Sequence, residues 1–137
     1  MKRVIFLCIC LLLCLTSVQA ERTVKIACVG NSITYGAGIA NREKNSYPAQ
    51  LQYYLGENYE IRNFGQNGTT VLTQGDHPYV QTKVYKDSKE FLPDIVLIKL
   101  GTNDTKPQNW KYKEQFAKDY HCLLYTSDAA DERSSVD

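Results

Sequence analysis

Three segments along the chain predict β-strands, of which the first and the third are apolar runs, and a loop of small polar residues follows each of them. Between and after these runs, apolar residues recur at intervals of three and four, which is typical of amphipathic helices. The predicted strands cover residues 24–29, 59–64 and 93–100, and the predicted helices cover residues 48–55, 77–91 and 107–120. Strands that alternate with helices are the signature of a parallel sheet with right-handed crossovers, so the sequence predicts an α/β fold. The third strand is more apolar than the second, which predicts a central position for it in the sheet.

The first twenty residues predict a signal peptide that precedes the folded domain. Lys2 and Arg3 give a basic start, residues 4–15 are largely apolar, and residues 18–20 resemble a small-residue cleavage site. An apolar run of this length is too short to span a bilayer comfortably. We therefore expect export to the periplasm or the exterior, with no stable membrane insertion after the segment is removed.

Charge and cysteine content exclude several classes of function. The chain has 16 basic and 15 acidic residues, and removal of Lys2 and Arg3 leaves the two signs nearly balanced. This balance gives no support for nucleic-acid binding. Three of the five cysteines lie in the signal segment, which leaves Cys28 and Cys122. We expect no disulfide framework, no metal site and no cofactor, because these two thiols have no Cys or His neighbours at metal-ligand spacing.

Ser32 is the first candidate for a catalytic group. It follows Gly30 and Asn31 directly after the first predicted strand, and ligands of open parallel sheets bind at the carboxyl ends of the strands. The same three residues are also ordinary turn formers, so a purely structural turn is the alternative. The surrounding residues match neither a P-loop, nor the Gly-x-Ser-x-Gly elbow, nor the dinucleotide-binding pattern Gly-x-Gly-x-x-Gly.

The loops after the other two strands contain Gly68 and Asn103. If the strands are parallel, all three loops emerge at the same edge of the sheet. Acyl transfer needs a nucleophilic hydroxyl and hydrogen-bond donors aimed at the oxygen that becomes negative. The backbone N–H groups of Ser32 and Gly68 and the side-chain amide of Asn103 could supply three such donors. Asp104, next in the chain, could orient Asn103 or the loop, or it could cap a turn or helix.

Three motifs in this order resemble the SGNH hydrolases, also called GDSL esterases. The motifs are Gly30-Asn-Ser-Ile-Thr34, Asn63-Phe-Gly-Gln-Asn-Gly-Thr-Thr70 and Gly101-Thr-Asn-Asp104, and the resemblance extends over residues 24–120. It implies a three-layer α/β/α flavodoxin-like sandwich, of which this chain carries the N-terminal portion. It also implies a serine esterase with Ser32 as the nucleophile and Gly68 and Asn103 in the oxyanion hole.

Two departures from the family pattern affect the predicted chemistry. Asn31 stands where the family usually has an aspartate, which replaces a carboxylate by a neutral amide of the same shape. The general base of the family is a histidine in an Asp-x-x-His motif, and this chain has no such spacing. Asp76 and His77 are adjacent, so their side chains should diverge, and His121 lies in an atypical segment. We expect the base to lie beyond the end of this chain.

The sequence predicts three segments along the chain. Residues 1–20 are the predicted signal peptide, and residues 21–120 form a partial SGNH domain, since open α/β sheets usually have more than three strands. Residues 121–137 are polar, acidic and rich in serine where a fourth strand would be expected, which favours a tail outside the native fold.

The sequence thus predicts an exported serine esterase acting on O-acetyl groups of glycans or small esters, similar to sialate and polysaccharide O-acetylesterases. Three aromatic residues, Tyr35, Tyr79 and Trp110, could stack against sugars or serve only in packing. One alternative is a non-catalytic carbohydrate-binding module or an inactive fragment. Another is a lysophospholipase or thioesterase of the same family.

Overall fold

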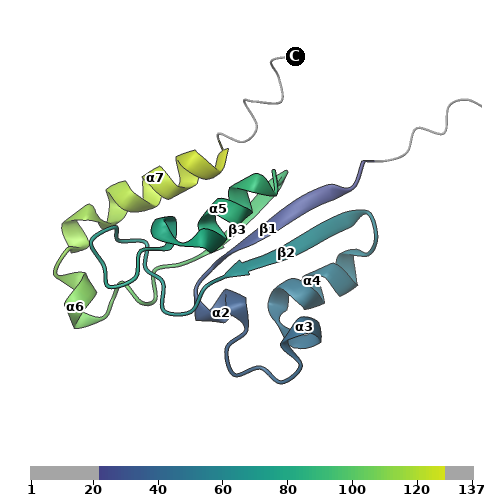
Figure 1. Ribbon diagram of the computed structural model, residues 1–137, viewed down its shortest axis with the longest axis horizontal. Helices are drawn as coiled ribbons and strands as arrows, with labels where there is room; N and C mark the ends of the chain where they lie inside the picture. Colours follow the sequence, from purple (N-terminus) through teal and green to yellow (C-terminus); the bar gives the residue numbers. More distant parts are fainter. Residues whose placement is uncertain (1–21, 129–137) are drawn as a thin grey trace, which may run out of the picture.

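The computed structural model describes residues 22–128, which form a parallel sheet of three strands with helices on both faces (Figure 1). The strands are β1 (Val24–Gly30), β2 (Tyr59–Gly65) and β3 (Ile95–Lys99), in the order β2-β1-β3. Val29 lies between Phe64 on β2 and Ile98 on β3. The predicted α/β fold and its three parallel strands are confirmed.

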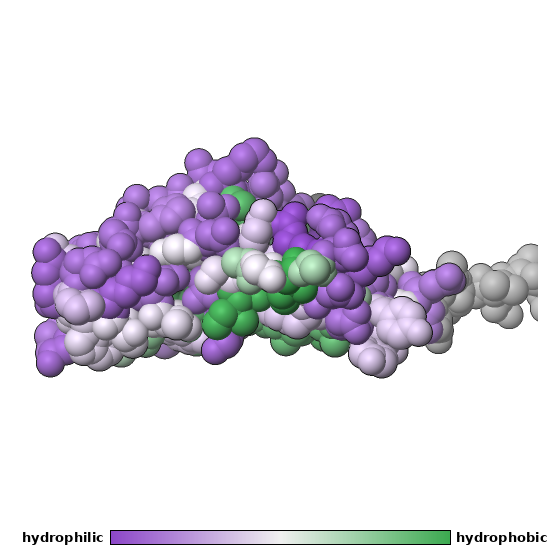
Figure 2. Space-filling view, turned by 90° about the horizontal axis from the view of Figure 1, so that it is seen from below, coloured by the Kyte–Doolittle hydropathy of each residue, from purple (hydrophilic) through white to green (hydrophobic). Residues whose placement is uncertain are grey.

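The first strand, and not the third, takes the central position among these three. Four consecutive residues of β1, Ile26 to Val29, are buried, because helices cover both of its faces and a strand pairs with each of its edges. The side chains of β3 alternate between exposed and half-buried, with Ile95 44% and Leu97 39% exposed. Figure 2 shows an apolar area in the middle of one face of the molecule. The prediction of a central third strand is therefore wrong for the described residues.

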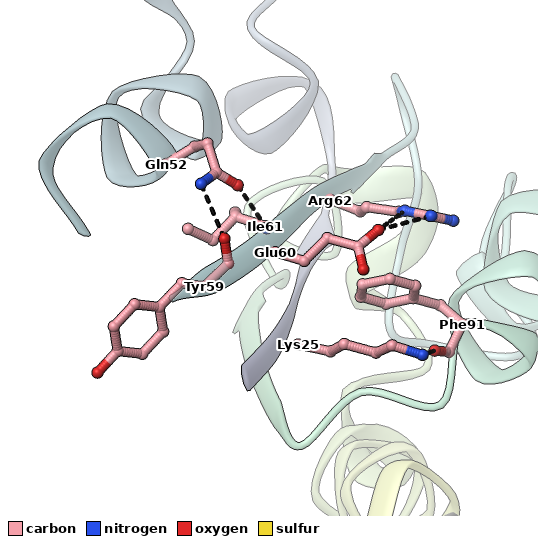
Figure 3. Close-up of polar contacts among 7 residues, drawn as sticks. All are labelled: Lys25, Gln52, Tyr59, Glu60, Ile61, Arg62 and Phe91. Carbon is pink, nitrogen blue, oxygen red and sulfur yellow. Dashed lines mark hydrogen bonds and ion pairs between the residues drawn. The ribbon is translucent and has the colours of Figure 1, made fainter. Parts of the chain in front are cut away.

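The hydrophobic core lies between the sheet and the layer formed by α5 (Lys83–Glu90) and α7 (Phe116–Asp128). Its buried members are Ala27, Val29, Phe64, Tyr79, Tyr85, Phe91 and Leu123. Polar atoms inside this layer are paired: the Tyr79 hydroxyl donates to the Phe64 carbonyl at 2.7 Å. At its outer end, the cations of Lys25 and Arg62 lie over the ring of Phe91 (Figure 3).

On the other face of the sheet, β1 and β2 are covered by α2 (Ser32–Tyr35), α3 (Arg42–Asn45) and α4 (Tyr47–Leu55). The α4 helix begins where the sequence predicts, because Pro48 suits the first turn of a helix. It ends at Gly56, whose φ of 75° is readily adopted only by glycine. The chain is thus a three-layer α/β/α arrangement.

Two predicted helices are divided in the structure. The segment 77–91 contains a 3₁₀ turn at Tyr79–Gln81 before α5, because Thr82 is extended and caps α5 by accepting from the Tyr85 N–H. The segment 107–120 contains α6 (Pro107–Trp110), a 3₁₀ turn (Lys113–Gln115) and the start of α7.

The helix predicted to end at residue 120 continues to residue 128, and this expected end is wrong. Leu123 is 1% exposed and belongs to the core, and the Tyr85 hydroxyl donates to Thr126 at 2.9 Å. Whether residues 121–137 form a tail outside the native fold stays a prediction, and residues 129–137 lie outside the described part. The predicted signal peptide, residues 1–20, also lies outside it. Among residues 22–128, no helix has the length and apolar character needed to cross a bilayer.

Candidate active site

Ser32 is the first residue of α2 and stands immediately beyond the carboxyl end of β1. Asn31 caps this single-turn helix: its backbone is extended, and its side-chain oxygen accepts the Ile33 N–H at 3.0 Å. Gly36, with a φ of 86°, ends the helix. The cap therefore places Ser32 at the helix N-terminus, where backbone N–H groups are free to bind negative charge.

Backbone contacts join the loop of Ser32 to the ends of both neighbouring strands. The Asn31 N–H donates to the Lys99 carbonyl at 3.3 Å, and the Gln66 N–H donates to the Gly30 carbonyl at 2.9 Å. A side chain at position 65 would collide with α2, since its Cβ would lie 2.1 Å from the Tyr35 nitrogen. Parallel pairing thus brings all three loops to one edge of the sheet.

The loop after β2 contains Gly68, and two hydrogen bonds close this loop so that a later part of it lies beside Gly68. Gly68 has a φ of 79°, in the left-handed region that favours glycine. The Thr70 N–H donates to the His77 carbonyl and the Thr70 carbonyl accepts the Tyr79 N–H, each at 2.9 Å. This closure brings the imidazole of His77 back to Gly68, where a Cβ would lie 3.6 Å from Nδ1. No motif in the sequence indicates that His77 and Gly68 lie close together.

Asn103 contacts the same loop directly. Its side-chain amide donates to the Thr69 carbonyl at 2.9 Å. Because a side-chain amide has two donor hydrogens, one remains for a further acceptor. The structure therefore brings Asn103 into contact with the residue that follows Gly68. The backbone on the N-terminal side of Ser32 is hydrogen-bonded to the ends of the strands that precede these two loops.

Asp104 holds the loop after β2 against the loop after β3. Its carboxylate is fully buried and accepts the N–H groups of Val71 at 3.1 Å and Leu72 at 2.8 Å. Of the roles considered for Asp104, these contacts fit the orientation of a loop, and neither a helix cap nor a bond to the Asn103 side chain is present among the described contacts. The structure shows a clamp between two loops.

Asn109 is a second clamp, which the sequence did not indicate. It is fully buried, and its amide donates to the Asn103 carbonyl at 2.9 Å and to Asp76 Oδ1 at 3.0 Å. Its side-chain oxygen accepts the Asp76 N–H at 2.8 Å. Hydrogen bonds from Asn109 and from Gln108 lower the pKa of the Asp76 carboxyl. Asn109 thus fixes the backbone of Asn103 relative to the loop that contains Gly68.

The two histidines of the chain have different surroundings. The carboxylate of Asp76 is bonded to Asn109 and Gln108, so no pairing with its neighbour His77 is present among the described contacts. His121 is exposed on α7. Among residues 22–128, no cluster of three or more His, Cys, Asp or Glu side chains could hold a metal ion.

Of the three aromatic residues considered for sugar stacking or packing, Tyr79 serves in packing, because it is fully buried in the core. Tyr35 is 36% exposed and Trp110 is 41% exposed. Both lie on elements that follow a strand end, α2 and α6. These two remain available to a ligand.

The thiol of Cys28, the hydroxyl of Tyr47 and the side-chain amide of Asn31 are uncharged polar groups close to α2. Burial raises the pKa of Cys28 to about 11 and that of Tyr47 to about 12, so both are uncharged near neutral pH. The Asn31 side-chain nitrogen is buried without a hydrogen-bond partner among the described residues. A lost hydrogen bond of this kind costs about 1–3 kcal/mol, so this amide would gain from an acceptor.

The chain is similar to known proteins in both sequence and fold. The profile of the GDSL-like lipase/acylhydrolase family matches residues 28–126. The chain is 52% identical over 104 residues to an acetylxylan esterase of Xylanibacter ruminicola, an alignment that covers 76% of this chain and 22% of that protein. A crystal structure of a carbohydrate acetylesterase family member from Sinorhizobium meliloti has the same fold, with a TM-score of 0.55 and 23% identity. That likeness covers 74% of this chain and 52% of the solved one. The chain therefore spans only part of the length of both relatives.

Proposed function

The chain belongs to the GDSL-like lipase/acylhydrolase family, and from that premise we propose that it carries the nucleophile and the oxyanion hole of a serine esterase. We propose O-acetyl groups on carbohydrates as the substrate. The relative that supports this substrate is an acetylxylan esterase with 52% identity to this chain. The residues of the proposed site all lie inside the matched region, 28–126.

The observation that carries the proposal is the contact between the loops that contain the three family motifs. The Asn103 amide bonds to the carbonyl next to Gly68, and the end of β1 that leads to Ser32 is bonded to the ends of both other strands. This arrangement supports a pocket at the carboxyl edge of the sheet, with a hydroxyl on one side and amide donors on the other.

In the proposed reaction, Ser32 Oγ attacks the ester carbonyl carbon while a general base takes the hydroxyl proton. The carbonyl oxygen becomes negative and is stabilised by the N–H groups of Ser32 and Gly68 and by the Asn103 amide. Collapse of the intermediate releases the sugar hydroxyl, which receives the proton, and leaves an acetyl group on Ser32. Water then attacks the acetyl group, so acetate is released and the serine is regenerated. Removal of one oxyanion donor typically costs about 10²–10³ in rate.

We propose that the general base is supplied by a residue outside 22–128. A base must come within hydrogen-bond reach of the nucleophile, and the exposed His121 on α7 has no contact with the site loops among the described contacts. His77 lies beside Gly68, but no carboxylate among residues 22–128 bonds to it and orients it. Without a base, a serine hydroxyl is a weak nucleophile near neutral pH.

We also propose that the protein is exported. The proposal rests on the basic start and the apolar run of residues 1–20. Fractionation of cells that express the full-length protein, with detection of the cleaved amino terminus, tests it. Recovery of an uncleaved protein from the cytoplasm would contradict it.

Turnover of p-nitrophenyl acetate by the full-length protein tests the proposed esterase activity. We expect Ser32→Ala to reduce turnover by at least about 10³-fold, since the nucleophile is lost. Ser88→Ala is the matched control: it removes a buried hydroxyl on α5 that bonds the Tyr85 carbonyl and the Tyr79 side chain, and it lies outside the three motifs. Wild-type turnover in Ser32→Ala would overturn the proposal.

A further inference from the structure

A groove runs along the outer edge of β2, where α3 and α4 cover the sheet. Its volume is about 520 Å³, within the range of about 300–1,000 Å³ that is usual for ligand pockets. We call it the β2 groove. The lining residues that matter here are Tyr35, Arg42, Gln52, Ile61 and Gln66.

The β2 groove begins next to the helix that carries Ser32. Tyr35 is the last residue of α2 and Ser32 is its first, so less than one helical turn, which rises about 5.4 Å, separates them. Gln66 is bonded through its N–H to Gly30, two residues before Ser32. A substrate whose ester lies at Ser32 can therefore extend its alcohol part into the groove.

The lining offers hydrogen-bond donors that the protein itself does not use. The guanidinium carbon of Arg42 lies over the ring of Tyr35, 4.0 Å from its centroid, and a guanidinium stacked on a ring keeps the N–H groups at its edge free to donate. Its ion pair with Glu43 has a separation of 3.6 Å, too long for a good hydrogen bond. The side-chain amide of Gln66 has no partner among the described contacts. These groups suit a ligand rich in hydroxyl groups.

Two other kinds of ligand fit the β2 groove less well. An extended peptide could add to the free edge of a sheet, but the Gln52 side chain already bonds the Tyr59 carbonyl at 2.9 Å and the Ile61 N–H at 2.8 Å (Figure 3). A fatty acyl chain would have to lie against the charged side chains of Arg42 and Glu43, whose desolvation is costly.

We propose that the β2 groove binds the sugar residues of an uncharged glycan chain next to the residue that carries the ester. Arg42 and Gln66 donate hydrogen bonds to sugar hydroxyls, and the stacked pair of Tyr35 and Arg42 forms a flat wall beside the sugar ring. This inference rests on the proposed function, because it identifies the binding site for the sugar chain of the proposed acetylated substrate.

Kinetics of the full-length protein on two substrates test the inference. The substrates are acetylated xylo-oligosaccharides, which would fill the groove, and p-nitrophenyl acetate, which is too small to reach it. For Arg42→Ala and for Gln66→Ala, we expect the ratio of kcat/KM between the first and the second to fall about 3- to 10-fold, through KM. Lys44→Ala is the matched control, since it removes a positive charge from the same helix outside the groove, and it should leave the ratio unchanged.

Calorimetric titration with unacetylated xylo-oligosaccharide separates the inference from the esterase proposal. Binding that weakens about 3- to 10-fold in Arg42→Ala and Gln66→Ala, but not in Lys44→Ala, supports the groove even if the protein hydrolyses no ester. Hydrolysis of p-nitrophenyl acetate with equal oligosaccharide binding by all variants would overturn the groove and leave the esterase standing. Absence of both binding and hydrolysis would overturn both.

Discussion

Asp104→Ala removes the clamp between the loops that follow β2 and β3. The carboxylate is fully buried, and it accepts the N–H groups of Val71 at 3.1 Å and Leu72 at 2.8 Å. Both of these residues are at most 2% exposed, so water cannot replace the lost acceptor without opening the loop. Each orphaned N–H costs about 1–3 kcal/mol. Since the variant no longer has to bury a carboxylate, we expect the free energy of unfolding to fall by about 2–4 kcal/mol.

Urea denaturation of the full chain measures this loss, and hydrogen exchange of the Val71 and Leu72 amides locates it. Both amides should exchange much faster in the variant, because their acceptor is gone. Asp87→Ala is the matched control, since its carboxylate is partly exposed and pairs with Lys83 one turn away on α5; it should cost less than about 0.5 kcal/mol. If Asp104→Ala stays within about 0.5 kcal/mol of the wild type and both amides remain protected, the clamp does not stabilise the loops.

Three other expectations concern the packing around the site. Gly65→Ala should prevent stable folding, because its Cβ would lie 2.1 Å from backbone of α2; Gly38→Ala, with open space around it but a φ of 79°, should cost only about 1–2 kcal/mol in a thermal melt. Tyr79→Phe should lower the free energy of unfolding in urea by about 0.5–1.5 kcal/mol, since it removes the hydrogen bond from the Tyr79 hydroxyl to the Phe64 carbonyl. Burial raises the pKa of Cys28 from 9.0 to about 11, so its contribution to stability is complete below pH 9 and is lost as the pH rises through 11. In the folded protein at pH 8, iodoacetamide should label the exposed Cys122 and spare the buried Cys28, as mass spectrometry of the peptides would show.

Local patterns in the sequence predicted the elements whose boundaries depend on nearby residues. Two of the strands, β1 and β3, are largely apolar runs, and α4 has Pro48 in its first turn and Gly56 at its end. The order of the strands was not predictable in this way. β1 is central because the connections place its neighbours on both sides, whatever the relative apolarity of β3. An extended residue at Thr82 divided the predicted helix over 77–91, and helical spacing alone does not reveal such a break.

In the candidate site, too, the sequence indicates what depends on nearby residues and does not indicate contacts between distant ones. Ser32, Gly68 and Asn103 were found because each stands in a motif after a strand, and their roles stay a prediction. Asn109 could not be found, since its partners include Asp76, which is 33 positions away in the sequence. The sequence left two roles open for Tyr79, sugar stacking and packing, and its contact with Tyr85 of α5 in the core decides for packing.

The most direct measurement is a crystal structure of the full-length protein after reaction with diethyl p-nitrophenyl phosphate, which phosphorylates an activated serine. The account predicts a diethylphosphoryl group on Ser32 Oγ. Its free oxygen should lie about 2.7–3.1 Å from the backbone nitrogens of Ser32 and Gly68 and from the side-chain nitrogen of Asn103. A phosphoryl group on another residue, or one on Ser32 whose free oxygen reaches neither Gly68 nor Asn103, would contradict the account.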